Sequence, residues 1–388
     1  MSNRIVIGLD LAKDSTAAVA LGGQGREQWR RTLRRQRLLP FLGRQAPCIV
    51  AMEACAGAHY LARQAQQYGH EVRLYPPKHI KAYQRGQKND YNDALAVAEA
   101  AQHGRLSSVP VKPVAQQDDV LVVQQRRQLK QEQVRLGNHI RALLAERGLV
   151  LPKGTAALRR RLPSLLEDAD NGLTPTVRRV LNGIYRRWLA LLEELAWYDQ
   201  ELERQAREED ARQRLCEMPG VGAVIAGALK AWMGDGKQFR RGRDASAALG
   251  LVPRQHSTGG RQVLGGISKR GDRYTRAQLI NGAQAVLRQA HRKDDALHRW
   301  VVRLQASRGH NKAVTALANK LVRIAWVILA RGERYPPRYA RSDPRHPERR
   351  TKREEVPTPG CEGNGHAMTA QARPAYRKPA QAIGSMKP

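Results

Sequence analysis

The sequence predicts an α/β domain at the amino end, long helices in the middle and a mainly α-helical region after them. Short apolar segments of buried-strand type follow one another over residues 1–112. Apolar residues at heptad spacing then mark residues 113–208 as a helical linker. Glycine-rich turns separate further helical segments over residues 209–334. The chain is therefore expected to hold three structured regions followed by a tail, residues 335–388.

The first region has the strands and helices of an α/β domain. The predicted strands are residues 4–10, 16–21, 48–53 and 71–75, of which the first two form a hairpin. Prolines 76 and 77 end the last strand, because proline cannot donate to a sheet ladder. Helices are predicted over residues 60–68 and from residue 93 to residue 104.

Two long helices are predicted in the linker. In the first, Val122, Leu129, Leu136 and Leu143 recur every seven residues, the spacing of a coiled-coil seam. The second opens at Thr174-Pro175, a capping residue followed by proline at the first helical position. Apolar residues then recur in steps of four and three up to Leu202. We expect these helices to support a homodimer or tetramer, with an intramolecular hairpin as the alternative.

The third region begins with a turn that could hold a phosphate. Met218-Pro219-Gly220-Val221-Gly222 before an alanine-rich segment is typical of a helix-hairpin-helix, in which Gly220 and Gly222 offer backbone N–H groups to nucleic acid. The alternative is a tight helical turn that uses glycine for its shape alone. Two more helices are predicted over residues 276–289 and 312–330. The tail is too poor in large apolar residues to fold, so disorder is expected there.

The charge balance indicates a polyanionic partner. The chain has 68 Lys and Arg against 35 Asp and Glu, a formal net charge of +33. Such an excess favours phosphate backbones as partners, although a generally basic proteome would also raise it. The four cysteines form no Cys-x-x-Cys pair, which disfavours a structural zinc site or a disulfide framework. No signal peptide is visible, and the longest apolar run, residues 325–330, is far below the roughly 18 residues of a membrane span. A cytoplasmic, nucleoid-associated protein without membrane contact is expected.

Four carboxylates of the first region form a candidate metal site. Asp10 and Glu53 each end a predicted strand, while Asp90 and Asp93 lie three residues apart at the start of a helix and so share a face. An RNase H-like fold gathers its ligands in this way, and oxygen ligands suit Mg²⁺ or Mn²⁺. Two such ions would stabilise both the attacking and the leaving oxygen of a phosphodiester. Alternatively, Asp10 is a turn residue and Asp90 or Asp93 a helix cap, whereas Glu53 is costly to bury without a partner.

A glycine-rich loop, residues 250–272, is the candidate nucleic-acid contact of the third region. Glycines let backbone approach a polyanion closely, and basic side chains can hold its phosphates. The expected contacts are Arg254, Thr258, Gly259, Gly260, Arg261, Ser268, Lys269 and Arg270. The pattern of a Walker A loop is absent. Ser257 is either a solvated loop residue or a nucleophile that attacks a DNA phosphorus.

Together these segments resemble a known family. Gly-Leu-Asp-Leu-Ala-Lys around Asp10, Met-Glu-Ala around Glu53 and Asn-Asp-Tyr-Asn-Asp-Ala over residues 89–94 resemble the DEDD motifs of the insertion-sequence 110/1111 family of transposases and the related Piv-type DNA invertases. Met-Pro-Gly-Val-Gly, Gly-Leu-Val-Pro-Arg-Gln-His-Ser-Thr-Gly-Gly and Gly-Ile-Ser-Lys-Arg-Gly-Asp resemble that family's C-terminal transposase domain. The resemblance covers roughly residues 3–333, in family order.

The resemblance implies a RuvC-like domain, a coiled-coil linker and a transposase domain with a serine nucleophile. It also implies excision and insertion of a bacterial element through covalent protein–DNA intermediates, with target and donor chosen by a structured noncoding (bridge) RNA. Asp10, Glu53, Asp90 and Asp93 match the four acidic positions. An ungapped register would place Thr258 at the family's serine, whereas a shift of one residue places Ser257 there, which we favour.

Two other functions remain open at this stage. A RuvC-like nuclease would hydrolyse DNA with water and would leave no covalent adduct. A non-enzymatic nucleic-acid-binding protein would behave alike with and without Mg²⁺.

Overall fold

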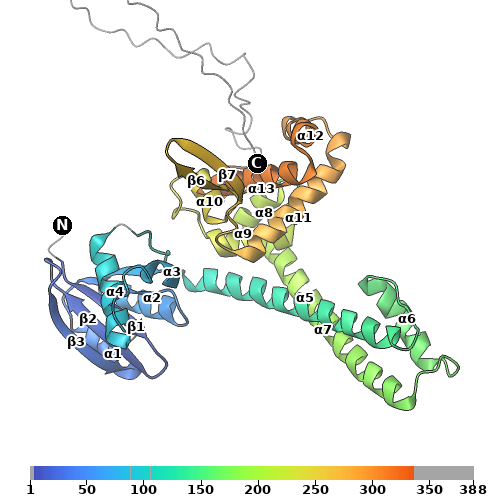
Figure 1. The fold of residues 1–388 in the computed structure, drawn as a ribbon, viewed down its shortest axis with the longest axis horizontal. Helices are drawn as coiled ribbons and strands as arrows, with labels where there is room; N and C mark the ends of the chain where they lie inside the picture. Colours follow the sequence, from blue (N-terminus) through green and yellow to red (C-terminus); the bar gives the residue numbers. More distant parts are fainter. Residues whose placement is uncertain (1–3, 88, 105, 336–388) are drawn as a thin grey trace, which may run out of the picture. The chain divides into compact units, whose positions relative to one another are not determined.

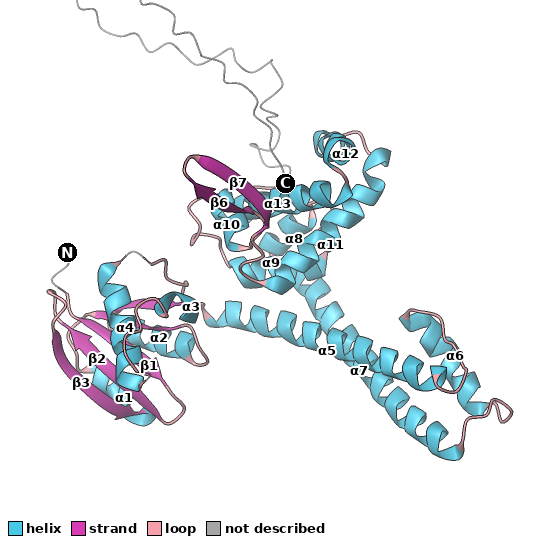
Figure 2. Cartoon of the chain, in the orientation of Figure 1, coloured by secondary structure: helices cyan, strands magenta, loops and turns pink. Residues whose placement is uncertain are grey.

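The computed structural model describes residues 4–87, 89–104 and 106–335 (Figure 1). The predicted disorder of the tail falls on residues outside the described part, apart from Tyr335. An α/β region comes first in the chain and a mainly helical region follows, as the sequence predicts (Figure 2).

A five-stranded sheet forms the centre of the α/β region. Its strands are β1 (Val6–Leu11), β2 (Ser15–Leu21), β3 (Glu27–Arg34), β4 (Ile49–Glu53) and β5 (Glu71–Tyr75), in the order β3-β2-β1-β4-β5. Strands β1, β2 and β3 are antiparallel neighbours, whereas β1, β4 and β5 run parallel. The predicted hairpin of β1 and β2 and the two later strands are confirmed.

Strand β3 and helix α1 (Arg35–Gly43) escaped the sequence analysis. Strand β3 reads Glu-Gln-Trp-Arg-Arg-Thr-Leu-Arg, and most of its residues are exposed because it is the edge strand beside β2. Helix α1 is short and contains Pro40, which hides its period. A charged edge strand lacks the apolar alternation on which sequence prediction depends.

Helices cover both faces of the sheet. Strand residues alternate between the faces, so β1 turns Val6 toward one and Ile7 and Leu9 toward the other. Helix α4 (Asp90–His103) packs on the first face through its alanines, and α3 (Pro77–Ile80) adds Ile80 there. Helices α1 and α2 (Ala58–Gln67) pack on the second face.

The linker helices pair within the chain. Helix α5 (Val114–Ala145) packs against α7 (Pro175–Glu208), and α6 (Thr155–Glu167), which the sequence analysis missed, joins their core. Trp188 Nε1 donates to the Gln133 carbonyl at 3.1 Å, and the Thr174 side chain caps α7 by accepting from Val177 N. Every seventh residue of α7 from residue 181 to residue 202 is buried. The two helices therefore form the intramolecular hairpin that was the alternative. The expected homodimer or tetramer stays a prediction.

The seam predicted for α5 is shifted. Leu129 and Leu136 are buried, but Val122 and Leu143 are only partly so. Val123 is buried instead, because the start of α5 also contacts α9 of the next region.

The third region is a helical core with one exposed hairpin. Its helices are α8 (Asp210–Cys216), α9 (Ala223–Met233), α10 (Gly242–Ala248), α11 (Arg273–Gln289), α12 (Ala296–Arg308) and α13 (His310–Arg331), with a short 3₁₀ helix at residues 290–292. The expected loop of residues 250–272 holds two strands, β6 (Pro253–Thr258) and β7 (Arg261–Ile267). The prediction of an irregular loop is therefore wrong over most of its length.

Helix α13 is long and apolar enough to qualify as a membrane span by length and composition. The sequence shows no long apolar run there, because polar residues interrupt it. Its buried residues, such as Leu317, Leu321 and Ile324, lie in the core of the third region. It has the character of a core helix.

Candidate active site

The parallel pairing of β1 and β4 brings two of the predicted carboxylates together. Leu9 of β1 faces Met52 of β4 in the register, so the next residues along the two strands are Asp10 and Glu53. Both side chains are half-buried at the carboxyl ends of their strands. The sheet itself therefore fixes the first half of the candidate site.

Gly8 allows helix α4, which carries the other predicted carboxylates, to approach strand β1 closely. A Cβ at Gly8 would lie 2.2 Å from the Ala94 carbonyl oxygen and 2.7 Å from the Ala98 nitrogen. The backbone of α4 thus rests directly on β1, two residues before Asp10. Asp93 precedes Ala94, so this close approach carries it toward the strand ends.

The start of α4 is capped by Asn89 rather than by either aspartate. Asn89 Oδ1 accepts from Asn92 N at 2.8 Å. Asp93 is half-buried and its Oδ1 accepts from Gln84 Nε2 at 2.8 Å, while Asp90 is exposed in the first turn. The alternative that these aspartates serve as the helix cap is therefore wrong.

The carboxylates act on one another electrostatically. Burial raises the pKa of Glu53, and the nearby charges of Asp10 and Asp93 raise it further. We name these three residues the acidic cluster; Asp90 is not among the causes of the shift. Among the residues that the structure describes, no group of three or more His, Cys, Asp or Glu side chains is already arranged to hold a metal ion.

Cys55 lies beside the acidic cluster, and the sequence analysis did not single it out. Cys55 is exposed as a residue, but partial burial of its thiol raises the pKa, and the charges of Glu53 and Asp10 raise it further. Its position two residues after Glu53 was the available signal, but an isolated cysteine without a partner motif is weak evidence.

The predicted serine lies on the exposed hairpin of β6 and β7, here called the ribbon. All residues from 253 to 266 are exposed, and Ser257 Oγ accepts from Gln255 Nε2 at 2.8 Å. Gly259 and Gly260, both with positive φ, form the turn between the strands. The predicted contacts Arg254 and Arg261 are accessible on the ribbon, one on each strand.

Ser257 and Thr258 point to opposite faces of the ribbon, because side chains alternate along a strand. Ser257 pairs with Gln262, whereas Thr258 pairs with Arg261, and directly paired residues share a face. His256 lies two residues before Thr258 and therefore shares its face, together with Arg261. The choice between Ser257 and Thr258 as nucleophile is therefore also a choice of face.

The segment after β7 is held by its backbone. Lys269 has φ 54°, and its N–H donates to the Gly250 carbonyl at 3.1 Å. A Cβ at Gly250 would lie 2.3 Å from the backbone of Arg270, whose carbonyl accepts from buried Arg276. The side chains of Lys269 and Arg270 are exposed, as a phosphate contact requires. The Ser268 hydroxyl is buried without a hydrogen-bond partner, so it does not face the surface.

The predicted phosphate turn separates into two roles. Gly220 has φ 74°, and a Cβ there would lie 2.5 Å from the Gly282 carbonyl of α11, so this glycine is required for packing. Gly222 is exposed at the start of α9, and no atom lies within 4 Å of the position of its Cβ. Gly222 is therefore placed where a phosphate could approach, whereas the contact of Gly220 with a phosphate stays a prediction.

Sequence comparison identifies the family. The family model described as "Transposase IS116/IS110/IS902 family" matches residues 212–299, and a DEDD transposase model of the IS110 group matches residues 7–147. A "probable family 20 transposase" of Pseudomonas aeruginosa is 40% identical over 85% of this chain and 98% of its own. The chain belongs to the IS116/IS110/IS902 family of transposases.

Two further members of the family cover the same part of the chain. The transposase for insertion sequence element IS1111A of Coxiella burnetii is 39% identical over 85% of this chain and 91% of its own. That for IS1328 of Yersinia enterocolitica is 37% identical over 86% of this chain and 98% of its own. A transposase cuts and rejoins DNA, so family membership makes DNA the partner of this chain and agrees with its charge of +33.

Proposed function

We propose that this transposase cleaves and rejoins the ends of its insertion sequence in a metal-dependent reaction through a serine–DNA intermediate, guided by a structured RNA of the element. The acidic cluster is the observation that carries this proposal. Two strand ends and one helix start, far apart in the sequence, bring Asp10, Glu53 and Asp93 within electrostatic range in a chain of strong positive charge. Like charges held close together raise the free energy of the fold, so such a cluster favours a functional role.

The donor set of the acidic cluster fits Mg²⁺ or Mn²⁺. Carboxylate oxygens are the ligands that these hard cations prefer, and a cation would relieve the repulsion that raises the pKa of Glu53. Asp10, Glu53 and Asp93 would hold it, with Asp90 as an outer ligand from the first turn of α4. When bound, the metal would stabilise negative charge on the phosphodiester oxygens.

The ribbon would supply the nucleophile. Ser257 Oγ forms a bond to the phosphorus while the bond from phosphorus to one strand's oxygen breaks, and the serine proton passes to that leaving oxygen. The resulting phosphoserine diester keeps the bond energy, so a strand hydroxyl can reverse the step and join new ends. Arg254, Arg261, Lys269 and Arg270 are exposed and would bind neighbouring phosphates.

Sequence choice by an RNA agrees with the exposed basic residues of the ribbon. They can bind phosphates of either nucleic acid, which carries little base information. A homodimer or tetramer would bring two element ends together. The RNA and the further copies of this chain are both part of the proposal.

A search for covalent adducts tests the reaction. Purified protein is incubated with Mg²⁺ and DNA that carries the joined element ends, with and without the element's RNA, and then denatured. We expect DNA attached to the wild-type protein and to Ser307→Ala, a serine of α12 outside the ribbon, but not to Ser257→Ala. Thr258→Ala shows which face of the ribbon carries the nucleophile. If this variant alone loses the adduct, Thr258 is the nucleophile.

Cleavage without any adduct would overturn the serine step. The acidic cluster would then activate water, as in a RuvC-like nuclease. An adduct that forms equally in EDTA would instead overturn the metal dependence.

A further inference from the structure

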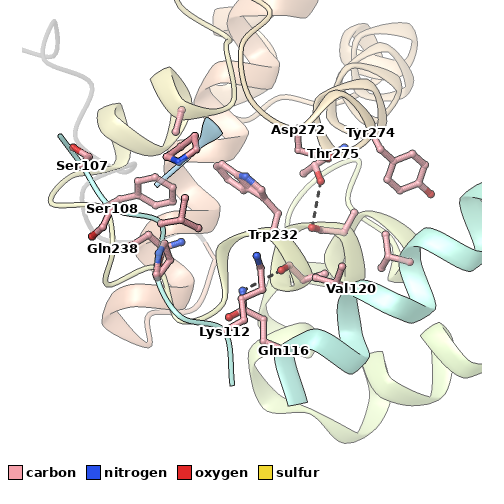
Figure 3. A pocket seen from close by; sticks show the side chains of 18 of the residues that line it. Ser107, Ser108, Lys112, Gln116, Val120, Trp232, Gln238, Asp272, Tyr274 and Thr275 are labelled. Carbon is pink, nitrogen blue, oxygen red and sulfur yellow. Dashed lines mark hydrogen bonds between the residues drawn. The ribbon is translucent and has the colours of Figure 1, made fainter. Parts of the chain in front are cut away.

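A cavity of about 700 Å³ lies between the segment that leads into α5 and the helices of the third region (Figure 3). Gln116 spans one side of it, with Nε2 donating to the Ala231 carbonyl at 3.0 Å. Thr275 lies across from it, and its hydroxyl donates to the Ala228 carbonyl at 3.4 Å. Its volume lies within the range of small-molecule sites, roughly 300–1,000 Å³.

Aromatic rings line this cavity. Trp232 lies at its centre, between Gln238 and Ser108 on one side and Thr275 and Tyr274 on the other (Figure 3). Its ring and that of Phe239 are 5.4 Å apart between centroids, with 33° between their planes. Trp326 Nε1 donates to the Phe239 carbonyl at 3.1 Å, which holds this pair in place. The lining of the cavity thus includes two packed aromatic rings with polar groups around them.

A half-buried cation borders the same cavity. The Lys112 ammonium lies 3.3 Å from His59 Nε2. Burial lowers the pKa of Lys112, and burial together with Lys112 and Arg63 lowers the pKa of His59 to about 4, so this histidine is neutral near pH 7. Within the described ranges Lys112 makes no ion pair with a carboxylate. A half-buried charge without a counter-ion favours an anionic ligand.

The carboxylates of the cavity already have partners. Asp272 Oδ1 caps α11 by accepting from Thr275 N at 2.6 Å, and Asp244 Oδ2 accepts from Arg241 N at 3.0 Å. Arg240, by contrast, is exposed and makes no ion pair with any residue that the structure describes. The lining therefore combines an aromatic surface with cations that lack carboxylate partners.

We propose that this cavity receives one unpaired nucleotide of the bound nucleic acid, with its base against Trp232 and its phosphate beside Lys112. The inference rests on the proposed function, in which the enzyme handles DNA ends and a structured RNA. Stacking on an aromatic ring suits any base, and a concave site of this size excludes a duplex but admits an extruded nucleotide. The shared chemistry is a nucleobase with its phosphate, from either DNA or RNA.

An abasic comparison tests the proposal without cleavage. Binding of the full-length protein is measured in EDTA at fixed salt, by fluorescence anisotropy, to a DNA duplex with one bulged nucleotide and to the same duplex with an abasic bulge. The wild-type protein should bind the bulged base at least about 5-fold more tightly than the abasic site. Trp232→Ala should lose this preference, and Trp232→Phe should keep most of it.

Lys112→Met should weaken binding to both duplexes, because the phosphate is present in both. Trp197→Ala on α7 and Lys153→Met before α6 are the matched controls, an exposed aromatic and an exposed cation away from the cavity, and should bind as wild type. Thermal unfolding checks that each variant is folded. If Trp232→Ala fails to fold, the proposal is still tested by the binding of wild type and of Lys112→Met to the two duplexes.

The same pair of probes made of RNA identifies the source of the nucleotide. A preference for the base in RNA alone assigns the cavity to the guide, and in DNA alone to the element ends. Equal binding to base and abasic probes in both would overturn the inference, even if the serine adduct forms. A base preference without any adduct would overturn the proposed reaction and leave the cavity site intact.

Discussion

The acidic cluster and the ribbon differ in how the fold holds them. The acidic cluster lies at strand ends over a packed sheet, and α4 rests on β1 so closely that Gly8 has no room for a side chain. The ribbon has only two strands, and all its residues from 253 to 266 are exposed. An isolated two-stranded hairpin is marginally stable in water. Its base is nevertheless fixed, since Ser268 N donates to the Val252 carbonyl at 2.8 Å.

This difference indicates a division of labour. Ligands of a hard cation must be positioned in advance, because the cation binds well only where several oxygens converge. The proposed nucleophile lies on an exposed ribbon, which can adapt to the DNA backbone that it meets. Substitutions in the first region should therefore change the reaction rate and the stability of the fold. Substitutions in the ribbon should mainly change its local order.

The largest expected effect comes from neutralising the acidic cluster. Asp10→Asn or Glu53→Gln should lower the rate of adduct formation by about 100-fold or more while the protein stays folded, because each removes a charged oxygen from the proposed metal site. Single-turnover kinetics at saturating Mg²⁺ measure this. Asp14→Asn, an exposed aspartate of the adjacent turn, is the control and should react as wild type. Equal losses in Asp14→Asn would show that the effect is not specific to the cluster.

The second-largest effect is expected at the contact between β1 and α4. Gly8→Ala should destabilise the protein by about 2 kcal/mol, since the new methyl group collides with the Ala94 carbonyl. Denaturant unfolding measures it, and adduct formation should fall with it. Gly183→Ala in α7, where no atom lies within 4 Å of the added Cβ, should instead be neutral or slightly stabilising. Unchanged stability in Gly8→Ala would mean that α4 does not rest on β1.

A smaller, local effect is expected in the ribbon. Gly260 has φ 76° and open space around it, so Gly260→Ala should cost about 1 kcal/mol in backbone strain without any collision. Hydrogen exchange of the β6 and β7 amides should quicken while global unfolding is unchanged. Gly266→Ala, with ordinary φ and open space, is the control. A fall in global stability would show that the ribbon is part of the core.

The smallest effect is a pH dependence. The pKa of Glu53 in the folded state lies above the ordinary value of a glutamate, so between the two the folded state binds more protons than the unfolded state. The stability of the metal-free protein should therefore decline as pH rises through this window. In Asp10→Asn one cause of the raised pKa is gone, and the decline should be shallower than in Asp14→Asn. Thermal unfolding in EDTA from about pH 4 to 7 tests this, and parallel curves would contradict it.

Much of the fold could be predicted from the sequence where periodicity is strong. The buried strands around Asp10 and Glu53 and the helix from Thr174 to Leu202 were visible because one pattern runs through each. The edge strand β3 and helix α6 were not, because the first carries charges and the second is short and contains Pro163. For the ribbon the sequence predicts a loop, because glycine and arginine hide the alternation of its strands.

By itself, the sequence determined the family, the order of the regions, the basic character and the identity of the candidate carboxylates, because motifs and periods are local properties of a chain. Only the tertiary structure decided that Asp93 joins Asp10 and Glu53, that Gly220 serves packing, that α5 and α7 pair within the chain, and that Ser257 and Thr258 occupy opposite faces of a ribbon. These depend on contacts between residues far apart in the chain, and no local pattern encodes which distant backbone will come close.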